Sequence, residues 1–203
     1  MVAAATAIGT LIGLPLGVFL ATSKRGELLS APLANSILGV IVNATRSTPF
    51  IILTVSIIPF TRLVAGTSIG TTAAIVPLAV AATPFIARLV EGSIREVDQG
   101  LIEAARAMGA SPLQILAKVL VPEALPGIVL GLTLAIVSLI GFSAIVGVVG
   151  GGGLGDLGIR YGYQRFMPDV MAAVVLVLIL LVQGIQSLGD ALSRKLNKRV
   201  RHG

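Results

Sequence analysis

Few side chains in this sequence are suited to covalent or metal chemistry. The 203 residues include a single histidine, His202, and no cysteine. Nucleophilic triads, thiolate sites and multi-ligand metal sites all need more of these groups. We therefore expect no catalytic residue, no metal site and no cofactor.

Two nucleotide-binding motifs can be judged by their spacing. Gly153, Gly155 and Gly158 form the string GLGDLG, which has the spacing of a dinucleotide fingerprint. That fingerprint acts only between a strand and a helix of an α/β unit, and the surrounding sequence has no strand pattern. The phosphate-binding pattern Gly-x4-Gly-Lys-Ser/Thr does not occur. We expect this chain neither to bind a nucleotide nor to hydrolyse ATP.

The most informative spacing lies in Glu103–Gly127, EAARAMGASPLQILAKVLVPEALPG. Gly109 is suited to the left-handed turn that ends a helix. Ser111 followed by Pro112 is suited to start the next helix, and Pro122 is expected to end it. The pattern predicts a hairpin of two short helices.

The predicted hairpin, at about residues 99–122, is amphipathic by helical spacing. Glu103 and Arg106 lie three residues apart on the polar face and are expected to pair weakly. A helix pair with one apolar face is suited to dock in a groove on another protein, and the alternative is a connecting loop that rests on the membrane. The two apolar stripes are Leu101, Ile102, Ala105 and Met108, and Leu113, Leu116, Ala117 and Leu120.

The rest of the chain predicts an all-α integral membrane protein with a single domain, residues 1–203. Only 12% of the residues are charged, against about 25% in soluble domains. Apolar runs of about 20 residues are long enough to cross a bilayer. The basic charge is expected to set orientation and contact lipid rather than bind nucleic acid. The expected spans are residues 2–22, 47–63, 71–90, 124–149 and 170–188, followed by a basic tail, 191–203.

Glycine spacing in the first span predicts helix packing. Gly9, Gly13 and Gly17 share one helix face, so another helix is expected to approach closely there. Prolines in or beside the second and third spans are expected to bend those helices. Residues 27–47 are apolar but contain one proline and two asparagines, and we expect them either to lie in the interface or to begin a span.

The distribution of lysine and arginine predicts the orientation of the chain. If the five expected spans alternate, only Arg62, Arg160 and Arg165 fall on the side of the N-terminus. We therefore expect the hairpin and the C-terminus to be cytoplasmic and the N-terminus to be outside. Arg88 and Glu91, at the inner end of the third span, are expected to pair and to mark the interface.

The hairpin resembles the cytoplasmic signature of the permease subunits of ATP-driven importers. That signature is Glu-Ala-Ala, three residues, Gly, nine residues and Ile-x-Leu-Pro. This chain has Glu103, Ala104, Ala105, Gly109 and Pro122 at the same spacing, with valine in place of the isoleucine and of the leucine. The stretches RSTPFIILTVSIIPFTRLVAGTSIG, AAIVPLAVAATPFIARLVE and GGGGLGDLGIRYGYQRF extend the resemblance to the five-span methionine-import branch of the family.

This resemblance implies an inner-membrane permease that imports methionine, in both L and D forms, by alternating access. The five signature residues would couple it to a cytoplasmic ATP-binding subunit, present in two copies. The other implied partners are an extracytoplasmic substrate-binding protein and a second copy of this chain, because five spans are few to enclose a path. Members of the family have residues before the first span, which suggests that the N-terminus is shortened here.

Two further sets of residues are candidates for function. Small and polar side chains in the fourth span, which the resemblance places beside the central path, are expected to line it, with Ile145 as an apolar constriction. Serines that bond back to their own helix are the alternative. A flexible outer loop is expected to meet the binding protein, or simply to be a solvated loop. The pathway set is Ser138, Phe142, Ser143 and Ile145, and the docking set is Asp156, Arg160, Tyr161 and Arg165.

Three alternative functions remain open at this point. The same type of importer could carry another small amino acid or solute. An ion-coupled secondary transporter or channel would typically bury ionisable residues at mid-membrane and show internal repeats. A membrane scaffold without transport would need its prolines and glycines only for assembly.

Overall fold

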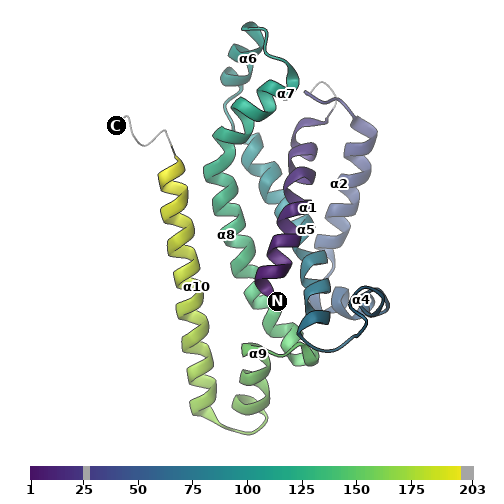
Figure 1. Ribbon diagram of the computed structural model, residues 1–203, viewed down its shortest axis with the longest axis vertical. Helices are drawn as coiled ribbons and strands as arrows, with labels where there is room; N and C mark the ends of the chain where they lie inside the picture. Colours follow the sequence, from purple (N-terminus) through teal and green to yellow (C-terminus); the bar gives the residue numbers. More distant parts are fainter. Residues whose placement is uncertain (25–27, 198–203) are drawn as a thin grey trace.

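The computed structural model describes residues 1–24 and 28–197, and every regular element in those ranges is helical. Four helices are long and apolar enough to cross a membrane, or five if a bent pair counts as one span, which confirms the all-α membrane class. The helices form one bundle with α6 and α7 at one end (Figure 1). The elements are α1 (Val2–Thr22), α2 (Pro32–Ser47), α3 (Phe50–Ser56), α4 (Ile58–Ala65), α5 (Thr71–Arg95), α6 (Gln99–Ala107), α7 (Pro112–Ile115), η1 (Leu116–Leu120), α8 (Val121–Val146), η2 (Gly147–Gly151), α9 (Leu154–Leu157), η3 (Gly158–Tyr163) and α10 (Pro168–Leu196), where η denotes a π-helix.

α1 packs along α5 through a stripe of glycine. A Cβ atom added at Gly9 would lie 2.6 Å from the Cβ of Ala82, and one added at Gly17 would lie 2.4 Å from the carbonyl oxygen of Ala87. Gly13 is buried between them on the same face. Because a side chain does not fit at these distances, the predicted close approach is confirmed, and the partner helix is α5.

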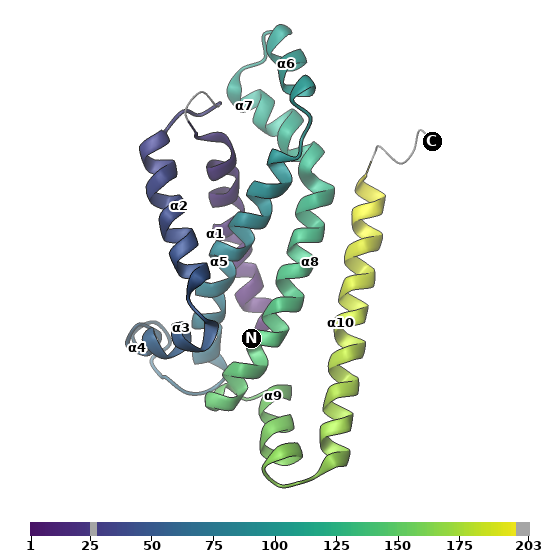
Figure 2. The ribbon, with the colours of Figure 1, turned by 180° about the vertical axis from the view of Figure 1, so that it is seen from behind.

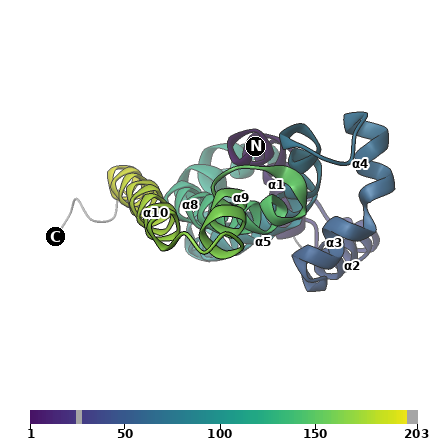
Figure 3. The ribbon, with the colours of Figure 1, turned by 90° about the horizontal axis from the view of Figure 1, so that it is seen from below.

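α8 lies between α5 and α10 (Figures 1 and 2). Its contact with α10 is close, because a Cβ atom at Gly189 would lie 2.0 Å from the hydroxyl oxygen of Thr133. Ser193 of α10 donates a hydrogen bond to the carbonyl oxygen of Pro126 at 3.0 Å. In an end view, α10 lies at one edge of the bundle and α2 to α4 lie at the other (Figure 3).

The structure differs from the sequence-based expectation in the second span. Residues 47–63 do not form one helix: α2 ends at Ser47, and α3 leaves it at an angle of 105°. Thr48 is extended, with φ −81° and ψ 124°, because a residue that precedes proline is pushed out of the helical region, and Pro49 follows it. The long helix of this region is therefore α2, residues 32–47, and the chain bends directly after it.

The second hairpin helix does not end at Pro122. Residues Pro112–Val146 form one continuous helical segment, in which η1 joins α7 to α8. The Val121 N–H bonds to the carbonyl oxygen of Leu116, so the wider π-helical turn comes directly before the proline. Pro122 then lies in the first turn of α8, where a missing N–H is tolerated. This continuity joins the hairpin to a membrane helix.

The described ends of the chain lie at opposite ends of the bundle. Met1 contacts Gly153, whose added Cβ would lie 2.9 Å from the Met1 side chain, whereas the last turns of α10 pack near the start of α8 beside the hairpin. α2 runs away from the hairpin end (Figure 1), so Arg46 lies at the far end of that helix and not on the hairpin side, where the expected spans had placed it.

Candidate functional site

Local signals build the hairpin. Asp98 caps α6 by accepting the Gly100 N–H at 2.7 Å. Gly109 closes the turn with a φ of 78°, and no atom lies within 4 Å of the position of an added Cβ, so glycine is needed there for conformation and not for space. Ser111 and Gln114 form a capping box that starts α7. The roles predicted for Gly109 and Ser111 are confirmed, and Asp98 and Gln114 are further caps that the same capping signals identify.

Each hairpin helix buries one side and leaves apolar groups uncovered on the other. Ala105, Ile115 and Leu120 are 4%, 1% and 3% exposed. Met108 and Leu113 are 81% and 67% exposed. The predicted stripes are therefore split: part of each forms the small core of the hairpin, which also includes Ile115, and part forms an apolar surface at the tip of the molecule.

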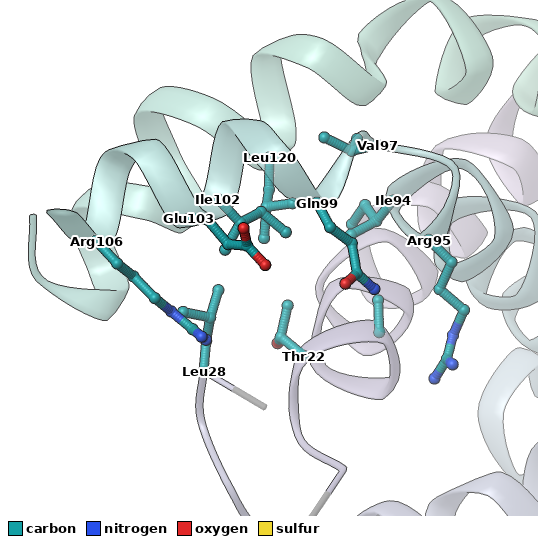
Figure 4. A pocket seen from close by; sticks show the side chains of 11 residues that line it. Thr22, Leu28, Ile94, Arg95, Val97, Gln99, Ile102, Glu103, Arg106 and Leu120 are labelled. Atoms are coloured by element: carbon teal, nitrogen blue, oxygen red, sulfur yellow. The ribbon is translucent and has the colours of Figure 1, made fainter. Parts of the chain in front are cut away.

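Glu103 and Arg106 do not form the expected pair, since no ion pair joins them in the part of the chain that the structure describes. Their side chains diverge, and both line a cavity of about 350 Å³ between α6 and the ends of α1 and α5 (Figure 4). Glu103 is directed into this cavity. Its carboxylate is therefore available to a partner outside the described chain.

An ion-pair network that the spacing only partly indicated connects α5 to its neighbours. The expected pair of Arg88 with Glu91 is present, and Arg95 also binds Glu91, at 3.0 Å. Arg88 donates to the carbonyl oxygen of Gly39 at 3.1 Å and to Oδ1 of Asn43 at 2.9 Å. The pair therefore connects α5 to α2.

The four pathway candidates do not share one environment. Ser138, Phe142 and Ile145 lie on one face of α8 by helical spacing, and Phe142 stacks on Phe50 of α3 with ring centroids 4.5 Å apart. Ser143 instead lines a cavity of about 770 Å³ against α1 and α10. Both serine hydroxyls donate to carbonyl oxygens of their own helix, as the alternative reading expects.

Three of the docking candidates lie on the helical segment α9–η3, at the end of the bundle opposite the hairpin (Figure 1), and Arg165 lies in the turn that follows it. Asp156 binds Arg160 at 2.8 Å, and the guanidinium carbon of Arg165 lies 4.6 Å from the ring centroid of Tyr161. The segment is helical rather than a flexible loop. A Cβ atom at Gly155 would lie 2.3 Å from the Cα of Ala144, so the glycine of this GLGDLG string serves helix packing.

Among residues 1–24 and 28–197, no three His, Cys, Asp or Glu side chains come together in a way that could hold a metal ion. His202 and the last part of the basic tail, residues 198–203, lie outside the described residues.

Comparison with known proteins agrees with the family that the hairpin signature indicated. Residues 13–202 match the family described as binding-protein-dependent transport system inner membrane component. The chain is 55% identical to the probable D-methionine transport system permease protein MetI of Vibrio cholerae, over 98% of this chain and 88% of that protein. A solved structure of the MetNI methionine ABC transporter in an inward-facing conformation superposes with a TM-score of 0.93 at 49% identity, over 97% of this chain and 91% of the other. An amino acid ABC transporter at 22% identity, with a TM-score of 0.76 over 96% of this chain and 90% of the other, shares the fold.

Proposed function

Because the chain belongs to the family of binding-protein-dependent transport system inner membrane components, we propose that it is the permease subunit of an ATP-driven methionine importer. The identity to D-methionine permeases over nearly the full chain supports this substrate. ATP hydrolysis belongs to a partner subunit. The chain supplies the path and the connection to that partner.

One observation carries the coupling role: the tip of the hairpin is apolar and uncovered, and its second helix continues into a membrane span. Met108 and Leu113 would fill a groove on the ATPase, with Glu103 beside them. The continuous helical segment Pro112–Val146 would then transmit any movement of the groove to the membrane-spanning part of the chain.

The mechanism that follows is alternating access. ATP draws two ATPase subunits together, and the two hairpins of a homodimer move with them, so that the paired bundles open outward. A binding protein docks at the end formed by α9 and η3, with the N-terminal side outside and the hairpin and C-terminal side in the cytoplasm, and it delivers methionine in either stereochemical form. Hydrolysis returns the dimer to the inward-facing state.

Uptake of labelled methionine tests the proposal, in proteoliposomes that contain this chain and its cognate ATPase, with binding protein outside and ATP inside. Gly109→Val should reduce uptake at least tenfold, since valine resists a left-handed φ. Gly66→Val is the matched control, because Gly66 has a φ of 72° and an equally open surround but ends α4, far from the hairpin.

The outcomes separate the alternatives. If ATP drives no methionine uptake but another solute competes for the binding protein, the importer remains and the substrate is wrong. Flux down an ion gradient in the absence of the ATPase would contradict the importer itself. If Gly109→Val and Gly66→Val lose methionine uptake equally, the hairpin has no special role in coupling.

A further inference from the structure

The contact between α2 and α5 places Arg46 near the depth expected for the middle of the membrane. α5 is a candidate membrane span from Thr71 to Arg95, so its midpoint at Thr83 is expected near the bilayer centre. At that midpoint, an added Cβ of Gly13 would meet Thr83 and Ile86 of α5. Phe85 therefore lies at the same depth, and the guanidinium carbon of Arg46 is 6.0 Å from the centroid of its ring.

A guanidinium at this depth does not face lipid without a large cost, so such side chains face protein or a water-filled cavity. Arg46 is exposed on the surface of this single chain, and no acidic side chain pairs with it within the described ranges. The charged groups on the helix beside it are Arg88 and Arg95, and both share one carboxylate, Glu91. The surroundings of Arg46 thus carry an excess of positive charge.

The backbone beside Arg46 is also typical of a substrate site. Arg46 is in the last turn of α2, directly before the 105° bend into α3, and transporters commonly bind substrates where a membrane helix is interrupted near the midplane. Beyond the bend, Phe50 and Phe142 stack on each other. A cation beside aromatic groups suits a small molecule that carries a carboxylate and an apolar side chain.

We propose that Arg46 binds the carboxylate of the transported amino acid as it crosses the middle of the membrane, with Phe85 holding the guanidinium in place. The inference rests on the proposed function, because it takes an amino acid as the substrate. The simpler alternative is that Arg46 only stabilises the C-terminal end of α2.

Cysteine accessibility tests whether Arg46 faces water. The chain has no cysteine, so Arg46→Cys in the assembled complex carries the one thiol of this chain. We expect it to react with a charged, water-soluble thiol reagent at least ten times faster than Leu11→Cys. Leu11 is the matched control, since it is 78% exposed near the midpoint of α1. Equal reaction rates for Arg46→Cys and Leu11→Cys would overturn the proposal.

Transport tests the role of the charge. Arg46→Gln should reduce methionine uptake at least tenfold while ATP hydrolysis stimulated by the binding protein persists, and Arg46→Lys should recover part of the uptake. Arg62→Gln is the control, because Arg62 also lies in the last turn of a helix, α4. If Arg46→Gln and Arg62→Gln transport equally, Arg46 does not bind the substrate. If the unmodified complex moves no methionine, the failure lies with the proposed function instead.

Discussion

Glycine is required for different reasons in the hairpin and in the contact between α1 and α5, which we call the seam. In the seam, Gly9, Gly13 and Gly17 have no left-handed φ, and it is the lack of space that excludes a side chain. In the hairpin, Gly109 has open space around it, and its φ of 78° excludes most side chains. The seam is thus defined by contact with a distant helix, and the hairpin by the backbone of its own turn. Changes in the seam should affect stability, whereas changes in the hairpin should affect coupling.

The largest effect on stability is expected from Gly17→Ala. The new methyl group would lie 2.4 Å from a backbone oxygen and 2.7 Å from Val90 Cβ, and overpacking of this kind costs about 3 kcal/mol. Gly92→Ala is the matched control, since Gly92 is in α5 with nothing within 4 Å, and the change should stabilise the helix by up to about 1 kcal/mol. Thermal unfolding of the purified complex in detergent measures both. An unchanged unfolding temperature for Gly17→Ala would contradict the close contact between α1 and α5.

A smaller loss is expected from Glu91→Gln. This change leaves Arg88 and Arg95 without their shared carboxylate. Breaking a buried pair costs about 3–5 kcal/mol, and we expect about 2 kcal/mol here because the Arg95 side chain is 36% exposed and is partly screened. Thermal unfolding should show the loss, and Glu96→Gln, at the residue next to Arg95 without an ion pair to it, should not. Equal unfolding temperatures would show that the network adds nothing.

In the hairpin, Ser111→Ala should cost about 1 kcal/mol, the usual value for a lost N-cap. The capping box with Gln114 disappears, so α7 frays while the membrane helices persist. Hydrogen exchange should increase at residues 113–115 and remain unchanged in α5. Ser111→Asp keeps a capping oxygen and should retain protection. Exchange that increases throughout the bundle would mean that the hairpin and the seam are not independent.

The smallest effect on stability, and a clear effect on coupling, is expected from Met108→Ser. Met108 is 81% exposed, so the folded chain loses almost no packing. Affinity for the ATPase should fall about tenfold, because an apolar side chain no longer fills the groove. Co-purification at graded ATPase concentration measures this, with the adjacent Ala107→Ser as a control. Unchanged affinity would place the docking surface elsewhere.

Short-range signals predicted the local parts of the structure. A left-handed turn at Gly109 and a cap at Ser111 depend only on allowed φ and ψ values and on neighbours one helical turn away. The rule that a residue before proline is extended accounts for the bend after α2, which the expected span at 47–63 overlooked. The prediction that Pro122 ends the second hairpin helix was wrong for a related reason, since a π-helical turn before it lets the helix continue.

The sequence by itself determined that the chain is helical and membrane-spanning, and that it carries the coupling signature of an importer permease. Hydropathy, capping and spacing are properties of one segment at a time. Only the tertiary structure decided that the α1 glycines meet α5, that Ile115 is buried, and that Arg46 lies beside Phe85. Apolar periodicity is a weak guide to such contacts in lipid, because a face toward lipid and a face toward another helix are equally apolar. The partners of each helix therefore depend on how the whole bundle fits together.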